Sequence, residues 1–154
     1  MGLTQAEADR LLQMEKRFVT NEPLELTQTL AMDFTRSLVS MDRREQFSLK
    51  VWRSPDIYVR VTYNTTARSS IVLARLDING RRHRNPPSLD QPEGEWLTGT
   101  HLHIYREGLG DRFALREEEL PQRGFVLPLD LTGGFRSFLR LCGVVAVPQI
   151  QLGV

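Results

Sequence analysis

Apolar residues near the start of the chain recur at helical spacing. They form a single stripe, and Thr4 followed by Glu7 has the spacing of a capping box. Pro23 stands just beyond the last apolar position of the stripe. The pattern predicts one amphipathic helix over residues 5–19.

After Pro23 the pattern changes to alternation of apolar and polar residues, with β-branched and aromatic types enriched. We expect an antiparallel meander whose strands span residues 30–39 (the weakest), 45–53, 56–64, 69–78 and 100–106. The polar stretch 79–96 opens with Asn79-Gly80 and contains three prolines. It is predicted to be a long loop between the last two strands, and such loops are often functional.

Helical signals return near the C-terminus. Residues 115–120 are predicted to form a helical turn, and a helix follows Gly133-Gly134 and ends near Gly143. No repeat or linker divides the chain. The expected fold is therefore one α+β domain over residues 1–154, with a small antiparallel sheet and helices at its ends.

Length and composition narrow the class of protein. The chain has 154 residues, no apolar run long enough to span a membrane, and no basic and apolar leader in its first residues. Its single cysteine, Cys142, excludes an internal disulfide and a cysteine-only metal site. We expect a cytoplasmic protein with no membrane partner.

The net charge of +1 conceals a basic central segment. Residues 43–84 hold ten basic groups against three acidic ones, and all basic residues except Lys16 and Lys50 are arginine. Guanidinium groups are better suited than ammonium groups to bidentate hydrogen bonding with phosphate. The segment predicts an anion-binding surface, although a GC-rich genome would also enrich arginine.

Alternation along residues 100–106 gathers unusual side chains on one face. Leu102 and Ile104 point one way, whereas His101, His103 and Tyr105 point the other. If the neighbouring strands pair with this one, the same face carries Tyr58, Arg60, Arg75 and Asp77. The opposite, apolar face carries Ile57, Val59, Val61, Tyr63, Val72, Ala74, Leu76 and Ile78. The polar face is either simply solvated or a functional site.

This mixture of side chains suits cleavage of RNA-type phosphodiester bonds without a metal or other cofactor. His101 and His103 would divide the roles of base and acid, and Tyr105 would orient or donate. Arg60 and Arg75 would hold the phosphate. Three loop residues would close over the ligand: Arg82, His83 and Arg84. Arg75 could instead be a structural partner of Asp77 or Glu107.

Two other classes of function stay open. His101, His103 and Glu107 have the spacing of the first metal motif of cupins, with His83 as a possible further ligand, but no histidine follows His103. The other class is a non-enzymatic binder: an antitoxin, an inhibitor or a nucleic-acid-binding module. In that case Trp52, Tyr58 and Tyr63 would stack on single-stranded nucleic acid, although Trp52 is more simply explained by packing.

Three stretches carry a resemblance to a known family: residues 14–18, residues 75–78 with 83–86, and above all residues 101–108 with their His-x-His-x-Tyr pattern. Over residues 5–115 the chain resembles an uncharacterised family of small bacterial and prophage proteins. The resemblance implies a link to ring nucleases, which linearise the cyclic oligoadenylate messengers of type III CRISPR antiviral defence; phage copies would be anti-CRISPR proteins.

That link implies cyclic oligoadenylate as the substrate and a homodimer, because a symmetric ring fits a twofold cleft. The alternative with the same chemistry is a ribonuclease toxin of a toxin–antitoxin pair, which would cut linear RNA.

Overall fold

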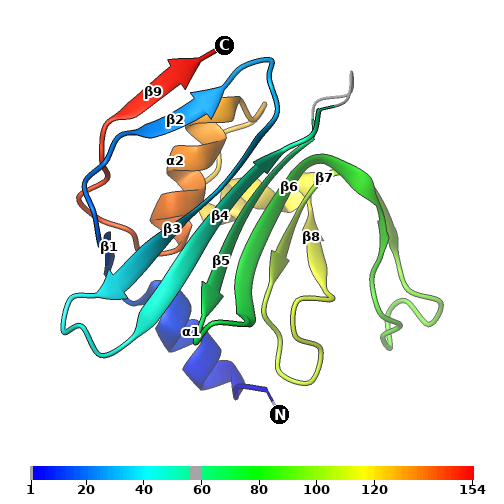
Figure 1. Ribbon diagram of the computed structural model, residues 1–154. Coiled ribbons are helices and arrows are strands. Elements are labelled where there is room, and N and C mark those ends of the chain that lie inside the picture. The colour runs from blue at the N-terminus through cyan, green and yellow to red at the C-terminus, as the bar shows by residue number, and fades with distance from the viewer. Residues whose placement is uncertain (1, 56–59) are drawn as a thin grey trace.

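One antiparallel sheet dominates the computed structural model, which describes residues 2–55 and 60–154 (Figure 1). Its strands lie in the order β1-β3-β4-β5-β6-β7-β8. Their bounds are β1 (Lys16–Phe18), β3 (Met32–Ser40), β4 (Gln46–Arg53), β5 (Val61–Ala67), β6 (Ile71–Arg84), β7 (Trp96–Ile104) and β8 (Ala114–Arg116). From β3 to β8, each strand pairs with its neighbour in the chain, so the predicted meander is confirmed.

The helices cover one face of this sheet. They are α1 (Gln5–Gln13), α2 (Leu131–Leu141) and the 3-10 helix η1 (Glu117–Arg123). Figure 1 shows them behind the sheet, and their apolar side chains join those of β4 to β7 in one buried core. The α+β class is thus confirmed. No helix in residues 2–55 and 60–154 has the length and apolarity to cross a membrane.

Two short strands form a second, parallel sheet that the sequence pattern does not predict. They are β2 (Leu24–Thr27) and β9 (Ile150–Gly153), from opposite ends of the chain. Leu24 and Leu26 of β2 are fully buried in the core. This small sheet lies beside α2 in Figure 1.

Four of the six described residues that were expected in the core of the central strands are fully buried. Val61, Tyr63, Ala74 and Leu76 lie in the core, and Ile78 packs against it. Val72 is half-buried, because the register of β5 and β6 shifts between Thr65 and Thr66. Ile57, Tyr58 and Val59 lie outside the described residues.

The first helix is shorter than predicted. The Thr4–Glu7 capping box is present, but α1 ends at Gln13 and residues 16–18 form the edge strand β1. The cause is Lys16, whose buried ammonium donates hydrogen bonds to the carbonyl oxygens of Leu12, Met14 and Cys142 at 2.6 to 2.9 Å. It satisfies carbonyls where both α1 and α2 end, and burial lowers its pKa to about 8.

Lys16→Met is therefore expected to lower the free energy of unfolding by about 1–3 kcal/mol, because it leaves buried carbonyl oxygens without a hydrogen-bond donor. Urea unfolding at pH 7 measures the change. Lys50→Met is the matched control: its ammonium is half-exposed and lies 4.0 Å from Asp33. An equal effect of the two substitutions would show that Lys16 does not join the helix ends.

The second helix begins earlier than predicted. Asp130 is its N-cap and accepts a hydrogen bond from the Gly133 amide at 2.7 Å, so both glycines lie in the first turn. The predicted end is confirmed, because Gly143 follows the last turn with a φ of 73°.

Candidate functional site

Two rows of side chains cross the face of the sheet opposite the helices. Cross-strand pairing places Trp52 beside Thr62, Thr62 beside Asp77, and Asp77 beside His101. The adjacent row runs Lys50, Asn64, Arg75 and His103 in the same way. The expectation that Arg75, Asp77, His101 and His103 share one face is thus confirmed.

The β6–β7 hairpin bends beyond these rows. The register shifts twice, between Asp77 and Gly80 and again between Gly80 and His83, and bulges of this kind bend a strand. Gly80 permits a close approach: a Cβ there would lie 2.8 Å from the Asp77 Cβ and 3.0 Å from the His101 Cε1. Residues 79–84 therefore belong to β6, not to a loop, and Figure 1 shows this end of the hairpin arching over.

The bend brings all three histidines of the chain into one cluster. The His83 ring stacks on His101 with centroids 5.5 Å apart and meets His103 edge-on at 4.7 Å. The rings of His101 and His103 lie 4.9 Å apart. His101 and His103 are buried beneath His83, which is itself only half-buried.

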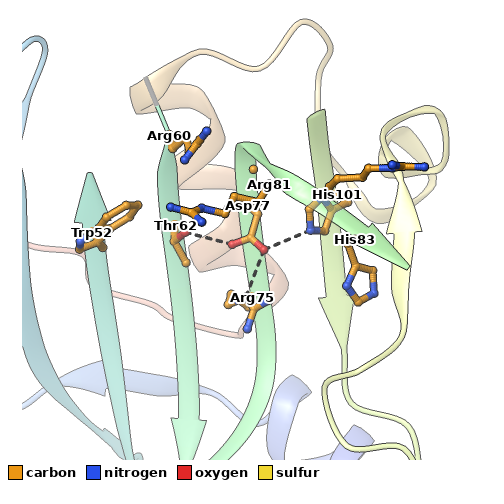
Figure 2. A pocket seen from close by; sticks show the side chains of 10 residues that line it. Trp52, Arg60, Thr62, Arg75, Asp77, Arg81, His83 and His101 are labelled. Carbon is orange, nitrogen blue, oxygen red and sulfur yellow. Dashed lines mark hydrogen bonds and ion pairs between the residues drawn. The ribbon is translucent and has the colours of Figure 1, made fainter. Parts of the chain in front are cut away.

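The three imidazoles have different hydrogen-bond partners. Both ring nitrogens of His101 face acceptors: Nδ1 donates to the Gly99 carbonyl at 3.0 Å, and Nε2 donates to Asp77 Oδ2 at 3.2 Å. The imidazolium satisfies both bonds, because it alone donates from both nitrogens. Asp77 also accepts from the Thr62 hydroxyl at 3.0 Å. Figure 2 shows this carboxylate between Thr62, Arg75 and His101.

His103 makes three polar contacts. Its Nδ1 lies 2.7 Å from the Asp111 carbonyl oxygen, and its Nε2 lies 2.9 Å from Arg75 Nη2 and 3.4 Å from Asp77 Oδ2. The same guanidinium donates from Nε to Asp77 at 3.2 Å and from Nη1 to the Asp111 carboxylate at 3.4 Å. Arg75 therefore bridges Asp77 and His103. Glu107 is elsewhere and accepts from the Gln5 amide.

His83 has one ring nitrogen available. Its Nε2 donates toward Asn85 Oδ1 at 3.0 Å and the Arg112 carbonyl at 2.9 Å, which leaves Nδ1 unprotonated. Nδ1 has no hydrogen bond to any residue in 2–55 or 60–154. Burial, with the neighbouring His103 and His101 charges, lowers the pKa of His83 below its ordinary value despite the bonds at Nε2. His83 thus presents a base at neutral pH.

Burial alone would raise the pKa of Asp77, but its partners outweigh that effect. Hydrogen bonds from the histidines, with the charge of Arg75, hold the pKa of this carboxyl well below its usual range. Asp77 therefore carries a full negative charge at neutral pH and accepts its hydrogen bonds in that form.

A cavity of about 400 Å³ opens over the bend. His83 and His101 line one side, Trp52 lies across from them (Figure 2), and the guanidinium-bearing residues are Arg60, Arg75, Arg81 and Arg82. Arg60 and Arg81 make no ion pair with a carboxylate in the described part of the chain. The cavity therefore suits an anionic ligand.

Five of the eight predicted site residues line this cavity: Arg60, Arg75, Arg82, His83 and His101. His103 is buried in the histidine cluster beneath it, and the other two lie elsewhere. Tyr105 lies just beyond β7 and packs in the core; its hydroxyl accepts from the Leu3 amide at 2.6 Å and donates to the Leu3 carbonyl at 2.9 Å. Its expected place on the polar face is wrong, because the regular strand ends at Ile104. Arg84 points to the Glu93 carbonyl instead of the cavity.

Four further residues belong to the site: Trp52, Asp77, Arg81 and Asp111. Sequence reasoning gave Trp52 a role only as a stacking ring of a binder and Asp77 only as a partner of Arg75 on the polar face, and it gave Arg81 and Asp111 no individual role. Alternation carries a signal for Trp52 and Asp77, since both point away from the core. Tyr63, another of the three rings considered for stacking, is fully buried and donates its hydroxyl hydrogen to the Leu131 carbonyl.

One group of described residues offers the donor set of a metal site. Asp77, His101 and His103 place one ligand atom each within 4.8 Å of one another, and both histidines bond a backbone carbonyl through Nδ1, as metal ligands do. The Arg75 guanidinium, however, already bonds Asp77 and His103. The cupin-like set with Glu107 does not form, because Glu107 bonds Gln5.

Comparison with known proteins identifies a family but does not indicate an activity. No curated protein matches the chain, and no solved structure matches it. A family model matches residues 3–144, which hold the whole sheet, the histidine cluster and the arginine-lined cavity. The chain therefore belongs to the family of unknown function DUF6978.

Proposed function

We propose that the protein is a phosphodiesterase that cleaves RNA-type phosphodiester bonds without a metal, and that its substrate is a cyclic oligoadenylate. The observation that carries the proposal is His83: a neutral imidazole with a free Nδ1 at the rim of a cavity lined by arginines. Base catalysis near neutral pH requires such a group within reach of the substrate.

In the proposed reaction, Nδ1 of His83 takes the proton of a ribose 2′-hydroxyl. The 2′-oxygen forms a bond to phosphorus, the bond from phosphorus to the 5′-oxygen breaks, and water returns a proton to that oxygen. The products are a 2′,3′-cyclic phosphate and a 5′-hydroxyl. Arg60 and Arg81 stabilise the negative charge that builds on the phosphoryl oxygens.

The other two histidines support this base in the proposal. His101 and His103 are buried with both ring nitrogens bonded, so they place the positive charge of His101 beneath the cavity and hold the His83 ring. In this proposal His83 is the base and water is the acid, instead of His101 and His103, for which these roles were expected from the sequence.

The choice of a ring substrate is supported by the resemblance of residues 101–108 to proteins linked to ring nucleases. A ring nuclease on the host side would end CRISPR signalling, and a phage copy would be an anti-CRISPR protein. A homodimer is expected, since a twofold cleft matches a symmetric ring.

The test is to incubate the purified protein with excess EDTA and with cyclic tri-, tetra- and hexa-adenylate or a linear RNA, and to identify the products by mass spectrometry. Cleavage of the rings alone is expected. Cleavage of linear RNA would indicate a toxin-like ribonuclease, and no cleavage even after metals are restored would indicate a non-enzymatic binder.

The dependence of kcat/KM on pH is a second expectation. His83 acts as a base only when neutral, and its pKa lies below 6.5, so kcat/KM should rise with pH, reach half of its maximum below pH 6.5, and be level between pH 7 and 8. Initial rates measured from pH 4.5 to 8.5 show the profile. A rise centred above pH 7 would show that another group is the base.

A further inference from the structure

Trp52 is an unusual side chain for its position. It lies on the polar face of β4, outside the buried core cluster, although its neighbours Val51 and Arg53 are buried. Its ring is half-buried and lines the cavity next to Arg60 and Thr62. A large aromatic ring left partly open to water among charged groups is typical of a binding surface.

The register of the sheet sets the distance from this ring to the histidines. Trp52, Thr62, Asp77 and His101 are directly opposite one another on consecutive strands. Three strand spacings separate the backbones of Trp52 and His101 by roughly 14 Å. Because both side chains line the same cavity, a nucleotide can reach from the indole to the imidazoles.

We infer that Trp52 is the stacking platform for a nucleobase, with the attached phosphate held between Arg60, Arg81 and His83. This inference rests on the proposed function, because it names the part of the same substrate that the cavity recognises. Stacking on an aromatic ring is available to every base, so Trp52 selects nucleotides over other phosphate esters.

The second tryptophan provides a matched comparison. Trp96 is half-exposed, but the Arg82 guanidinium lies 4.0 Å from its ring centroid and Arg84 approaches it at 5.7 Å. Trp96 does not line the cavity. Trp96→Phe therefore leaves Trp52 as the only tryptophan and gives a fluorescence signal from the proposed subsite alone.

The experiment titrates Trp96→Phe protein with a 2′-O-methylated adenylate dinucleotide, which cannot supply the 2′-hydroxyl nucleophile, and with ribose 5-phosphate, which lacks a base. We expect the dinucleotide to quench Trp52 fluorescence. Calorimetry on the Trp52→Ala variant is expected to show a Kd for the dinucleotide raised about 5- to 150-fold. The Kd for ribose 5-phosphate should be unchanged, and Trp52→Phe should bind the dinucleotide within a few-fold of wild type.

An unchanged Kd of Trp52→Ala for the dinucleotide would overturn the inference. The proposed cleavage of cyclic oligoadenylate by the wild type would not be affected by that result. Equal losses for both probes would also overturn it, since they would mean that Trp52 shapes the phosphate site instead of binding a base. Binding that depends on Trp52 without any cleavage by the wild type would contradict the enzymatic proposal alone. Thermal melts of Trp52→Ala and Trp52→Phe exclude unfolding as the cause of a change in Kd.

Discussion

Replacing His83 with alanine is expected to lower the rate of phosphodiester cleavage by about 10²- to 10⁴-fold, the range for loss of a general base. The ring is half-buried at the rim of the cavity, so its removal takes away Nδ1 and leaves the core beneath intact. Single-turnover cleavage, with thermal melts on the same samples, separates the loss of chemistry from the loss of fold.

Tyr105→Phe is the control for this substitution. Its hydroxyl bonds only the Leu3 backbone among the described residues, so the variant should melt earlier and yet cleave at the normal rate per folded molecule. If His83→Ala keeps the wild-type rate, the proposed base is wrong. If Tyr105→Phe instead loses the activity, the catalytic groups lie near Tyr105, on the face of the sheet that the helices cover.

Asp77→Ala is expected to lower the free energy of unfolding by about 3–5 kcal/mol, because it leaves two cations beneath the cavity without their shared partner. Asp77 accepts bonds from Thr62, Arg75 and His101 and is nearly buried. Its pKa is held below the usual range, so its contribution is complete above about pH 4 and declines as the pH falls further. Urea unfolding at pH 7 and at pH 3 measures both effects.

Asp111→Asn is the matched control, since its carboxylate is about one-third exposed and lies 3.4 Å from Arg75. It should cost less than about 1 kcal/mol, as exposed ion pairs do. Adding His101→Gln to Asp77→Ala should recover part of the loss, because it removes one of the unpaired charges. Equal losses from Asp77→Ala and Asp111→Asn would show that the buried carboxylate does not organise the cluster.

The alternation of apolar and polar residues was sufficient to predict which strand residues lie beneath the cavity. Side chains two residues apart on a strand share a face whatever the tertiary fold, so Arg75 and Asp77 could be placed together, and likewise His101 and His103. The order of the strands along the chain then gave their pairing, because neighbouring strands in a meander are usually adjacent in the sheet.

The rim of the site could not be predicted in this way. His83 reaches the cluster only through two register shifts after Asp77, and a bulge leaves no signal in the pattern of apolar residues. Asn79-Gly80 instead suggested the start of a loop. Tyr105 was misplaced for the opposite reason, since alternation was extended one residue past the end of β7.

Long-range contacts account for the errors elsewhere. Residues 16–18 fit the helical stripe of α1, yet they form β1 because Lys16 bonds Cys142, which lies 126 residues away in the sequence. The pairing of β2 with β9 joins the two ends of the chain. Neither contact can be deduced from a local pattern.

The most direct test of the central claim compares cyclic tetra-adenylate with its 2′-O-methylated analogue, both incubated with the protein in excess EDTA. The account predicts that mass spectrometry finds a 2′,3′-cyclic phosphate from the natural ring and intact analogue in the second sample. Cleavage of both rings, or cleavage that requires an added metal, would contradict attack by the 2′-hydroxyl with His83 as its base.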